Sequence, residues 1–354
     1  MTGAGPTTTV LPAVQAWSGA RLTARSMRNG LLATAVLASA VVVLALLFGG
    51  VSLSPSRIVS GIGPDRLIFL HVRLPRVLLA AWVGAALAVA GAGLQPMLRN
   101  PLASPDIIGV SGGAALAAVV SLALLPVGFF GEMFVPLIAF AGAVASSVIV
   151  YRLSLVRGRA EPYTQILVGV IFNTVAASLI LVVNAMVDLL RSQSIVFWLM
   201  GGIELHSYRV LVLVAVLIVA GTLVLIRESP SLNLLALGDE GAEQLGVDIA
   251  ASRRRVFAAS SLLVGAAVSL TGVITFVGLI VPHVLRRILG SDSRLLVPAS
   301  FFGGAAFLVL CDLVARVAVA PSELPVGAIT ALTGGPFFVY LLRRRVRPMN
   351  ESEQ

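Results

Sequence analysis

The sequence contains no lysine, one cysteine and few charged residues, and these shortages exclude several classes of protein. Only 12% of the 354 residues are charged, and 58% are hydrophobic. A soluble globular domain carries about 25% charged residues, so this composition excludes a water-soluble fold. The single cysteine, Cys311, lies in an apolar run and excludes a disulfide framework or a site built from several thiolates. We therefore expect a membrane protein.

The absence of lysine also limits the chemistry of the chain. Without lysine there is no GxxxxGK[ST] phosphate-binding loop, so the chain is not itself an ATPase of that type. An HExxH zinc motif is missing too. The three histidines have no second metal ligand at helical spacing; they are His71, His206 and His283. We expect no catalytic residue, no metal site and no cofactor bound by this chain.

The net charge of +9 comes from arginine alone, because all 25 basic residues other than histidine are arginines. No polar domain carries a basic patch, so nucleic acid is not expected as a partner. Anionic lipid headgroups account for the charge more simply.

Long apolar stretches indicate membrane-spanning helices. About 17 residues is the lower limit for a helix that crosses the hydrocarbon core. Nine stretches of at least this length contain no Asp, Glu or Arg; they cover residues 29–56, 77–98, 107–131, 133–151, 162–187, 210–226, 256–285, 295–311 and 324–342.

Both ends of the chain carry arginines, which places both termini in the cytoplasm and requires an even number of spans. Residues 256–285 would form one helix about 45 Å long, more than one crossing needs. Gly272 lies in the middle of this stretch, so we divide it there. The prediction is an all-α polytopic membrane protein with ten transmembrane helices in residues 29–342, a cytoplasmic N-terminal tail at 1–28 and a C-terminal tail at 343–354.

This topology distributes the arginines unevenly, as the positive-inside rule requires. Eighteen of the 25 fall on the cytoplasmic side. The arginines between the first two spans lie on the external side, against the rule, so their position needs a separate explanation. The seven on the external side are Arg57, Arg66, Arg73, Arg76, Arg191, Arg209 and Arg316.

The longest polar insertion, residues 227–255, lies on the cytoplasmic side of this topology. Ser231 or Asn233 can cap a first short helix, Asp239 can begin a second, and Gly246 can end it. The insertion is either a solvated loop or a docking element for a cytoplasmic protein.

Five segments, in order along the chain, resemble the FecCD family of ABC-importer permeases, which carry ferric siderophores, haem or cobalamin. The resemblance covers nearly the whole chain except the first 28 residues. The segments are Arg73–Leu116 (RLPRVLLAAW and onward), Leu235–Val247 (LALGDEGAEQLGV), Phe276–Asp292 (FVGLIVPHVLRRILGSD), Cys311–Arg316 (CDLVAR) and Glu323–Phe338 (ELPVGAITALTGGPFF).

The resemblance implies a non-enzymatic permease subunit in the bacterial inner membrane, forming half of a translocation path. It implies a second permease subunit, identical or related, two ATPase subunits that bind ATP and Mg²⁺, and an extracytoplasmic substrate-binding lipoprotein. A ferric siderophore is the expected cargo, with haem or cobalamin as alternatives. An ion-coupled secondary transporter is disfavoured, because the apolar stretches contain no acid for coupling.

The resemblance also implies roles for individual residues on the external side. Arg73, Arg76 and Arg316 match arginines that pair with glutamates of the binding protein. Guanidinium suits this contact, since it stays charged and binds carboxylate with two parallel hydrogen bonds. Alternatively, these arginines pair with lipid phosphate or with Asp65 and Asp312.

Two further sets of residues follow from the resemblance. Pro162 and Tyr163 match the cytoplasmic gate, and the fifth span, with Asn173 and Thr174, matches a helix that lines the path. Alternatively, its polar side chains bond a neighbouring helix. The residues expected to couple the chain to the ATPase are Leu237, Gly238, Glu240, Ala242, Leu245 and Gly246.

Overall fold

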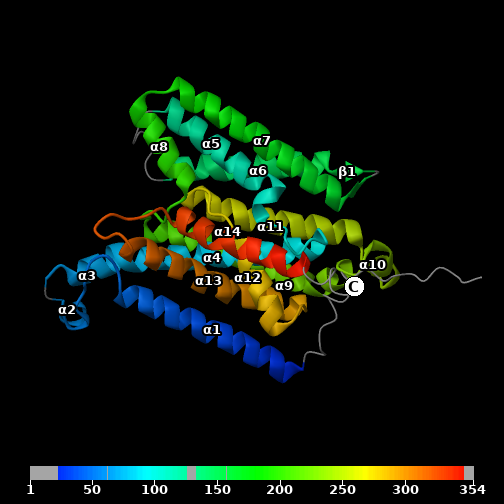
Figure 1. Cartoon of the computed structure of the whole chain (residues 1–354), viewed down its shortest axis with the longest axis horizontal. Helices are drawn as coiled ribbons and strands as arrows, with labels where there is room; N and C mark the ends of the chain where they lie inside the picture. Colours follow the sequence, from blue (N-terminus) through cyan, green and yellow to red (C-terminus); the bar gives the residue numbers. More distant parts are fainter. Residues whose placement is uncertain (1–22, 62, 126–132, 157, 347–354) are drawn as a thin grey trace, which may run out of the picture.

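The structure is a computed structural model that describes residues 23–61, 63–125, 133–156 and 158–346. Most helices run along the longest dimension of the molecule (Figure 1). The long helices are α1 (Ala24–Leu47), α4 (Leu74–Met97), α5 (Val110–Leu124), α6 (Phe134–Leu153), α7 (Pro162–Met186), α9 (Tyr208–Leu235), α11 (Ile249–Thr271), α12 (Val277–Leu289), α13 (Ser293–Val317) and α14 (Val326–Val346).

Shorter elements connect these helices. A π-helical turn, Phe69–Arg73, leads into α4, and a 3₁₀ turn, Pro105–Ile108, leads into α5. A two-stranded antiparallel hairpin pairs Leu155 with Ala160 and Val156 with Arg159. The remaining short elements are α2 (Pro55–Ser60), α3 (Asp65–Ile68), β1 (Leu155–Val156), β2 (Arg159–Ala160), α8 (Leu189–Met200) and α10 (Asp239–Gln244).

The helices confirm an all-α polytopic membrane architecture. Six of them are long and apolar enough to cross a membrane: α1, α4 with the turns before it, α6, α7, α9 and α13. The other expected spans fall on α5, α11, α12 and α14, which are shorter or carry more charge. The total of ten and the cytoplasmic position of both termini stay predictions, and the outer parts of both predicted tails, 1–22 and 347–354, lie outside the described residues.

The first span is shifted relative to its predicted range of 29–56. Helix α1 begins at Ala24, inside the predicted tail, because the Thr23 hydroxyl accepts a hydrogen bond from the Ser26 N–H at 3.2 Å. The helix ends at Leu47, just before Gly49 and Gly50, whose flexible backbone does not favour a helix.

The predicted break at Gly272 is confirmed, since α11 ends at Thr271 and α12 begins at Val277. Gly272 has a φ of 66°, a left-handed conformation that favours glycine. Three glycines meet at this break, which we call the glycine junction: Gly201, Gly272 and Gly327. A Cβ on any of them would collide with a backbone carbonyl of another segment, and the Gly327 N–H donates to the Gly201 carbonyl at 3.1 Å.

Two helical segments differ from the sequence analysis. Helix α8 was not predicted; the Asp188 carboxylate caps it by accepting from the Arg191 N–H at 3.0 Å. Helix α9 continues to Leu235, where a separate short helix was expected. The reason is that Asn233 does not cap a new helix: its amide bonds Asp292 at 2.8 Å and Ser293 at 2.7 Å, fixing α9 to the start of α13.

Helix α4 lies in the core and is buried along almost its whole length. It packs most extensively against α13 and also contacts α9, α11 and α12. Beyond α11 lie α5, α6 and α7, and α1 covers the far side of α13 (Figure 1). Glycines allow these close approaches: a Cβ on Gly84 would lie 2.6 Å from the Leu308 Cβ, and one on Gly278 would lie 2.5 Å from the Leu87 carbonyl.

Replacing Gly84 with alanine tests this packing. The added Cβ collides with the backbone of α13, so the variant should lose about 1–3 kcal/mol of stability, as overpacked cores do. Thermal unfolding of the detergent-purified protein measures the loss. Gly335→Ala in α14 is the control, because its Cβ would meet nothing within 4 Å. Equal melting temperatures for the two variants would contradict tight packing at Gly84.

Candidate functional sites at the two ends of the bundle

Polar side chains gather at the two opposite ends of α4. Arg76 lies in its first turn, and Arg99 is the second residue after its end, about 35 Å away along the helix axis. The first end lies beside α2 and α3, and the second lies beside α10 and the β1–β2 hairpin (Figure 1). We call them the α3 end and the α10 end.

At the α3 end, one buried carboxylate holds two arginines. The Asp312 side chain is fully buried on α13 and accepts from Arg76 Nε at 2.9 Å and from Arg316 Nε at 2.9 Å. Arg76 also donates to the exposed Glu323 at 2.7 Å. We call these four residues the Asp312 cluster. Pairing of Arg76 and Arg316 with Asp312 is the alternative that the sequence left open.

Arg73 bonds backbone instead of a carboxylate. Its guanidinium donates to the carbonyls of Leu46 and Leu47 at 3.2 Å and to the carbonyl of Val51. The first two belong to the last turn of α1, where carbonyls lack partners inside the helix and carry partial negative charge. Asp65, the other acid considered for the arginines, accepts the Ser54 N–H at 3.0 Å.

The three arginines expected to dock a binding protein therefore lie together, but two are enclosed. Arg73 and Arg316 are only 5% and 6% exposed, and a Cβ on Gly49 would lie within 3 Å of both guanidinium groups. Arg76 keeps 12% of its side chain exposed, next to Glu323. The docking role stays a prediction, and Arg76 is the member that a partner can reach most directly.

At the α10 end, the loop 227–255 presents a short exposed helix. Leu237 and Leu245 flank α10 and are 62% and 63% exposed, and Glu240 is exposed as well. Gly238 and Gly246, with φ of 126° and 84°, allow the chain to turn at either side of the helix.

Ala242 differs from the other residues expected to couple to the ATPase. Its side chain is fully buried and packs with Leu235 and Ile249 beneath α10. A fully buried side chain cannot touch a partner, so this position does not agree with the expected direct contact between Ala242 and the ATPase. The residue instead supports the helix that carries the exposed side chains.

Asp239 joins the loop to two other segments and, through Arg253, to a third. Its carboxylate accepts from Arg99, after α4, and from Arg253 Nη2, on α11, at 2.8 Å. Arg253 also donates to the Ala160 carbonyl at 2.8 Å, directly before the start of α7. Because the Arg253 side chain is only 4% exposed, loss of its carboxylate partner leaves a nearly buried charge.

The predicted gate residues begin α7 next to this link. Glu161 caps the helix by accepting from the Thr164 N–H at 2.5 Å and the Tyr163 N–H at 3.2 Å. The hydrogen bonding from Thr164 lowers the pKa of the Glu161 carboxyl, which stays ionised at neutral pH. Pro162 occupies the first position of α7, and Tyr163 is 73% exposed.

Asn173 and Thr174 lie farther along α7 and make different contacts. The Asn173 amide donates to the Asp106 carbonyl at 2.7 Å, which ties α7 to the 3₁₀ turn before α5. Thr174 is exposed and its hydroxyl donates to the Val170 carbonyl of its own helix at 2.9 Å. Asn173 thus has the helix-bonding role considered as an alternative, while Thr174 remains on the open face.

Sequence reasoning missed the acids that organise the α10 end. Asp239 was assigned only to helix initiation, and Glu228, which accepts from Arg255 at 2.5 Å and Ser252 at 2.8 Å, was not considered. Asp292, directly before α13, is another acid with such partners. Hydrogen bonds from Arg294, which contributes most, and from Asn233 lower the pKa of its carboxyl to about 2. The small number of acidic residues could have identified them. The chain has only 16, and an acid beside a membrane span is costly without a partner, so each such acid is a candidate for an ion pair.

Comparison with known proteins agrees with this arrangement. Residues 36–344 match the FecCD transport family. A cobalamin import system permease from Halobacterium salinarum is 43% identical over 77% of this chain and 73% of its own length. An Fe(3+)-citrate import system permease from Bacillus subtilis is 38% identical over 79% of this chain and 82% of its own length.

A solved structure has a similar fold. It is described as a metal-chelate type ABC transporter in an inward-facing conformation. The TM-score is 0.78, with 31% sequence identity over 90% of this chain and 99% of that one.

Replacing Asp312 with asparagine tests the buried cluster. The change leaves two nearly buried arginines without their shared carboxylate, which should cost about 3–5 kcal/mol of stability. Thermal unfolding in detergent is the measurement. Glu323→Gln removes the exposed partner of Arg76 and should cost at most about 1 kcal/mol. If the two variants unfold at the same temperature, Asp312 is not the charge that organises this end.

Proposed function

Because the chain belongs to the FecCD transport family and is an ABC-transporter permease of the inner membrane, we propose that it forms half of the path of an importer for ferric siderophores. Relatives named for cobalamin and ferric citrate support a cargo in which an organic ligand holds a metal ion. A ferric siderophore fits this class. Cobalamin and haem are the alternative cargoes.

The exposed helix α10 is the observation that carries the coupling part of the proposal. Leu237 and Leu245 place apolar surface on a charged loop, where water would otherwise cover it. A groove on an ATPase subunit buries such side chains, and Glu240 and Gly246 lie beside them. ATP and Mg²⁺ then bind to the two ATPase subunits, and this chain contributes no catalytic group.

The α10 end is cytoplasmic in this proposal, and the α3 end faces the binding lipoprotein. In this orientation both termini are cytoplasmic, which agrees with the even number of ten predicted spans. Movement of α10 reaches Asp239 first, and Asp239 passes it to Arg99 on the α4 side and to Arg253. Since Arg253 holds the Ala160 carbonyl, the movement arrives at Pro162 and Tyr163, the proposed gate.

An uncovered face of α7 supports a second permease subunit. Apolar side chains along α7 are exposed, among them Leu167, Ile171, Val175, Leu179 and Val182. We place the translocation path on this face, with Thr174 among its lining residues and a second copy or a related chain opposite.

ATP-dependent uptake into proteoliposomes tests the function. The reconstituted complex should import a radiolabelled ferric siderophore when ATP is inside and binding protein is outside. Labelled haem and cobalamin in parallel assays identify the alternatives. Uptake that needs a proton or sodium gradient and ignores ATP would contradict the importer and favour secondary transport.

Replacing Asp239 with asparagine tests the coupling path. The variant should still bind the ATPase through α10, while ATP-driven uptake falls at least about tenfold because the links to Arg99 and Arg253 weaken. Co-purification measures binding and proteoliposome uptake measures coupling.

Two variants of the loop complete this experiment. Gly246→Trp should abolish co-purification, because the side chain blocks the docking surface and glycine is favoured at a φ of 84°. Gly241→Ala is the control, since its Cβ meets nothing within 4 Å. Normal assembly and uptake with Gly246→Trp would remove the docking role from α10.

Replacing Arg76 with glutamate tests the docking of the binding protein. The new charge repels a carboxylate partner, so binding-protein affinity and uptake should both fall. Arg57→Glu is the control, because Arg57 is exposed at the same end and lies outside the motifs that imply docking. A melting curve separates loss of docking from damage to the Asp312 cluster. Unchanged affinity in a folded Arg76→Glu variant would refute the role.

A further inference from the structure

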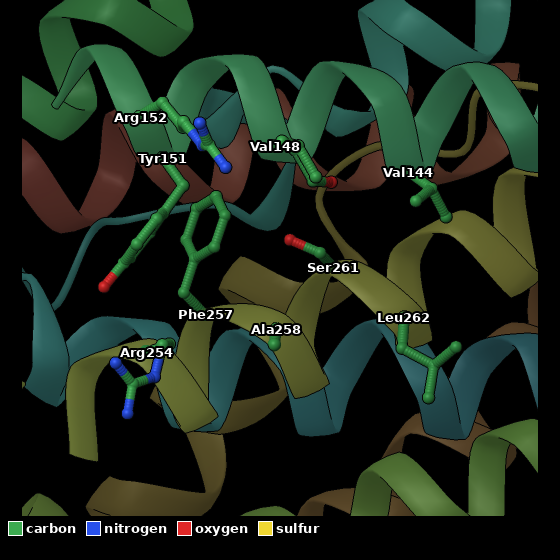
Figure 2. Close-up of a pocket in the computed structure, with 10 residues that line it drawn as sticks. Val144, Val148, Tyr151, Arg152, Arg254, Phe257, Ala258, Ser261 and Leu262 are labelled. Carbon is green, nitrogen blue, oxygen red and sulfur yellow. The ribbon is translucent and has the colours of Figure 1, made fainter. Parts of the chain in front are cut away.

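A groove with an apolar floor runs between α6 and α11 on the outside of the bundle. It has a volume of about 330 Å³ and is lined by five residues from each helix. In Figure 2, Tyr151 and Val148 on α6 point toward Phe257 and Ser261 on α11, and Arg152 and Arg254 lie at one end of the groove. The lining residues are Val144, Ser147, Val148, Tyr151 and Arg152 on α6, and Arg254, Phe257, Ala258, Ser261 and Leu262 on α11.

The lining residues have the same spacing on both helices, and the two helices run in opposite directions. On each, the lining residues recur at i, i+3, i+4, i+7 and i+8, which is one face of an α-helix. The stripe ends in Arg152 at the end of α6 and begins with Arg254 at the start of α11. The helices run antiparallel, so both arginines lie at the same end of the groove, beside Tyr151 and Phe257 (Figure 2).

This end of the groove is the α10 end of the molecule. Arg253, next to Arg254, bonds the Ala160 carbonyl in the hairpin that follows α6. The rings of Tyr151 and Phe257 pack with their centroids 5.3 Å apart and lie between the two arginines. The positively charged end of the groove therefore continues into an apolar part that runs along α6 and α11.

Arg152 and Arg254 are both exposed, and neither forms an ion pair with an acid in the described part of the chain. Their neighbours Arg253 and Arg255 do have carboxylate partners, Asp239 and Glu228. No acidic side chain lines the groove, so its charge is uncompensated. The groove thus complements a ligand with an anionic head and an apolar tail.

The dimensions fit a membrane lipid. The stripe from Val144 to Arg152 rises about 12 Å, close to the roughly 15 Å thickness of one hydrocarbon leaflet. Val144 and Val148 on its rim are 47% and 50% exposed on an apolar helix, as residues facing lipid are. Guanidinium groups bind phosphate with paired hydrogen bonds, and basic pockets between spans at the cytoplasmic surface bind anionic headgroups.

We propose that the groove between α6 and α11 binds an anionic glycerophospholipid of the phosphatidylglycerol type. Its phosphate lies at the end of the groove that carries Arg152 and Arg254, and one acyl chain follows the apolar lining toward Val144 and Leu262. The occupant belongs to the cytoplasmic leaflet, which rests on the orientation proposed above. The bound lipid fills the groove between α6 and α11, and Arg254 in its lining directly follows Arg253 of the Asp239 link.

Lipid titration followed by native mass spectrometry tests the proposal on the purified complex after removal of bound lipid. Phosphatidylglycerol should bind more tightly than phosphatidylcholine, which carries no net charge. Arg152→Gln/Arg254→Gln should weaken phosphatidylglycerol binding about thirty-fold, since each arginine near an anionic headgroup contributes about a factor of five. Free glycerol 3-phosphate should not compete, because it lacks the acyl chain.

Arg227→Gln/Arg287→Gln is the matched control. It removes the same charge from two exposed arginines that do not line the groove, Arg227 near the end of α9 and Arg287 near the end of α12. Phosphatidylglycerol affinity should remain unchanged in this variant. Equal loss in both double variants would overturn the proposal, because the attraction would then come from net charge.

Ala258→Trp tests the groove itself without changing charge. The indole fills the channel beside Phe257 and should displace the lipid. Retained binding in this variant would place the lipid elsewhere and overturn the proposal. A disulfide between two copies carrying Val148→Cys would also overturn it, because the second permease would then cover the groove. Uptake is measured separately, so failure of lipid binding leaves the importer function untouched.

Discussion

An ionised carboxylate inside a membrane protein is tolerated only when cations and hydrogen bonds surround it, and Asp312 is the centre of such an arrangement. Its two oxygens hold one arginine from α4 and one from its own helix, across the most extensive helix pair of the bundle. Arg316 in turn lies beside Arg73, which holds the last turn of α1. At this end the buried charge of Asp312 fixes α4 to α13, and Arg73 fixes α1 through backbone carbonyls.

At the α10 end, Asp239 likewise accepts from two arginines. Its side chain is 40% exposed and belongs to a six-residue helix, whereas the Asp312 side chain is fully buried. Ion pairs that water can reach exchange at little cost, whereas buried pairs resist separation. One end of α4 is therefore fixed by a buried pair, whereas the pair that follows α4 at the other end, Arg99 with Asp239, is open to water. This asymmetry agrees with the proposal that movement enters at the α10 end.

Much of the fold follows from apolar length and glycine alone. The break at Gly272 was predictable because an uninterrupted helix of residues 256–285 exceeds one crossing. Helix α8 was not predictable from apolar runs, because its twelve residues are too few and too polar to form a span. The continuation of α9 to Leu235 depends on bonds from Asn233 to Asp292 and Ser293, sixty residues away in the chain. Such long-range partners leave no local pattern.

The candidate sites were predictable to a similar degree. Motif positions identified Arg76 and the α10 segment, but neither spacing nor composition indicates that Ala242 is buried or that Arg73 bonds backbone carbonyls. The link from Asp239 through Arg253 to Ala160 joins three separate segments, so it becomes visible only after folding.

The glycine junction has a genetic consequence. At Gly201, Gly272 and Gly327 the backbones of three segments touch, and every other amino acid adds at least a Cβ where a carbonyl already lies. Each single-base change in a glycine codon that alters the amino acid introduces such an atom. Nearly every missense mutation at these three codons should therefore be harmful, whichever base changes.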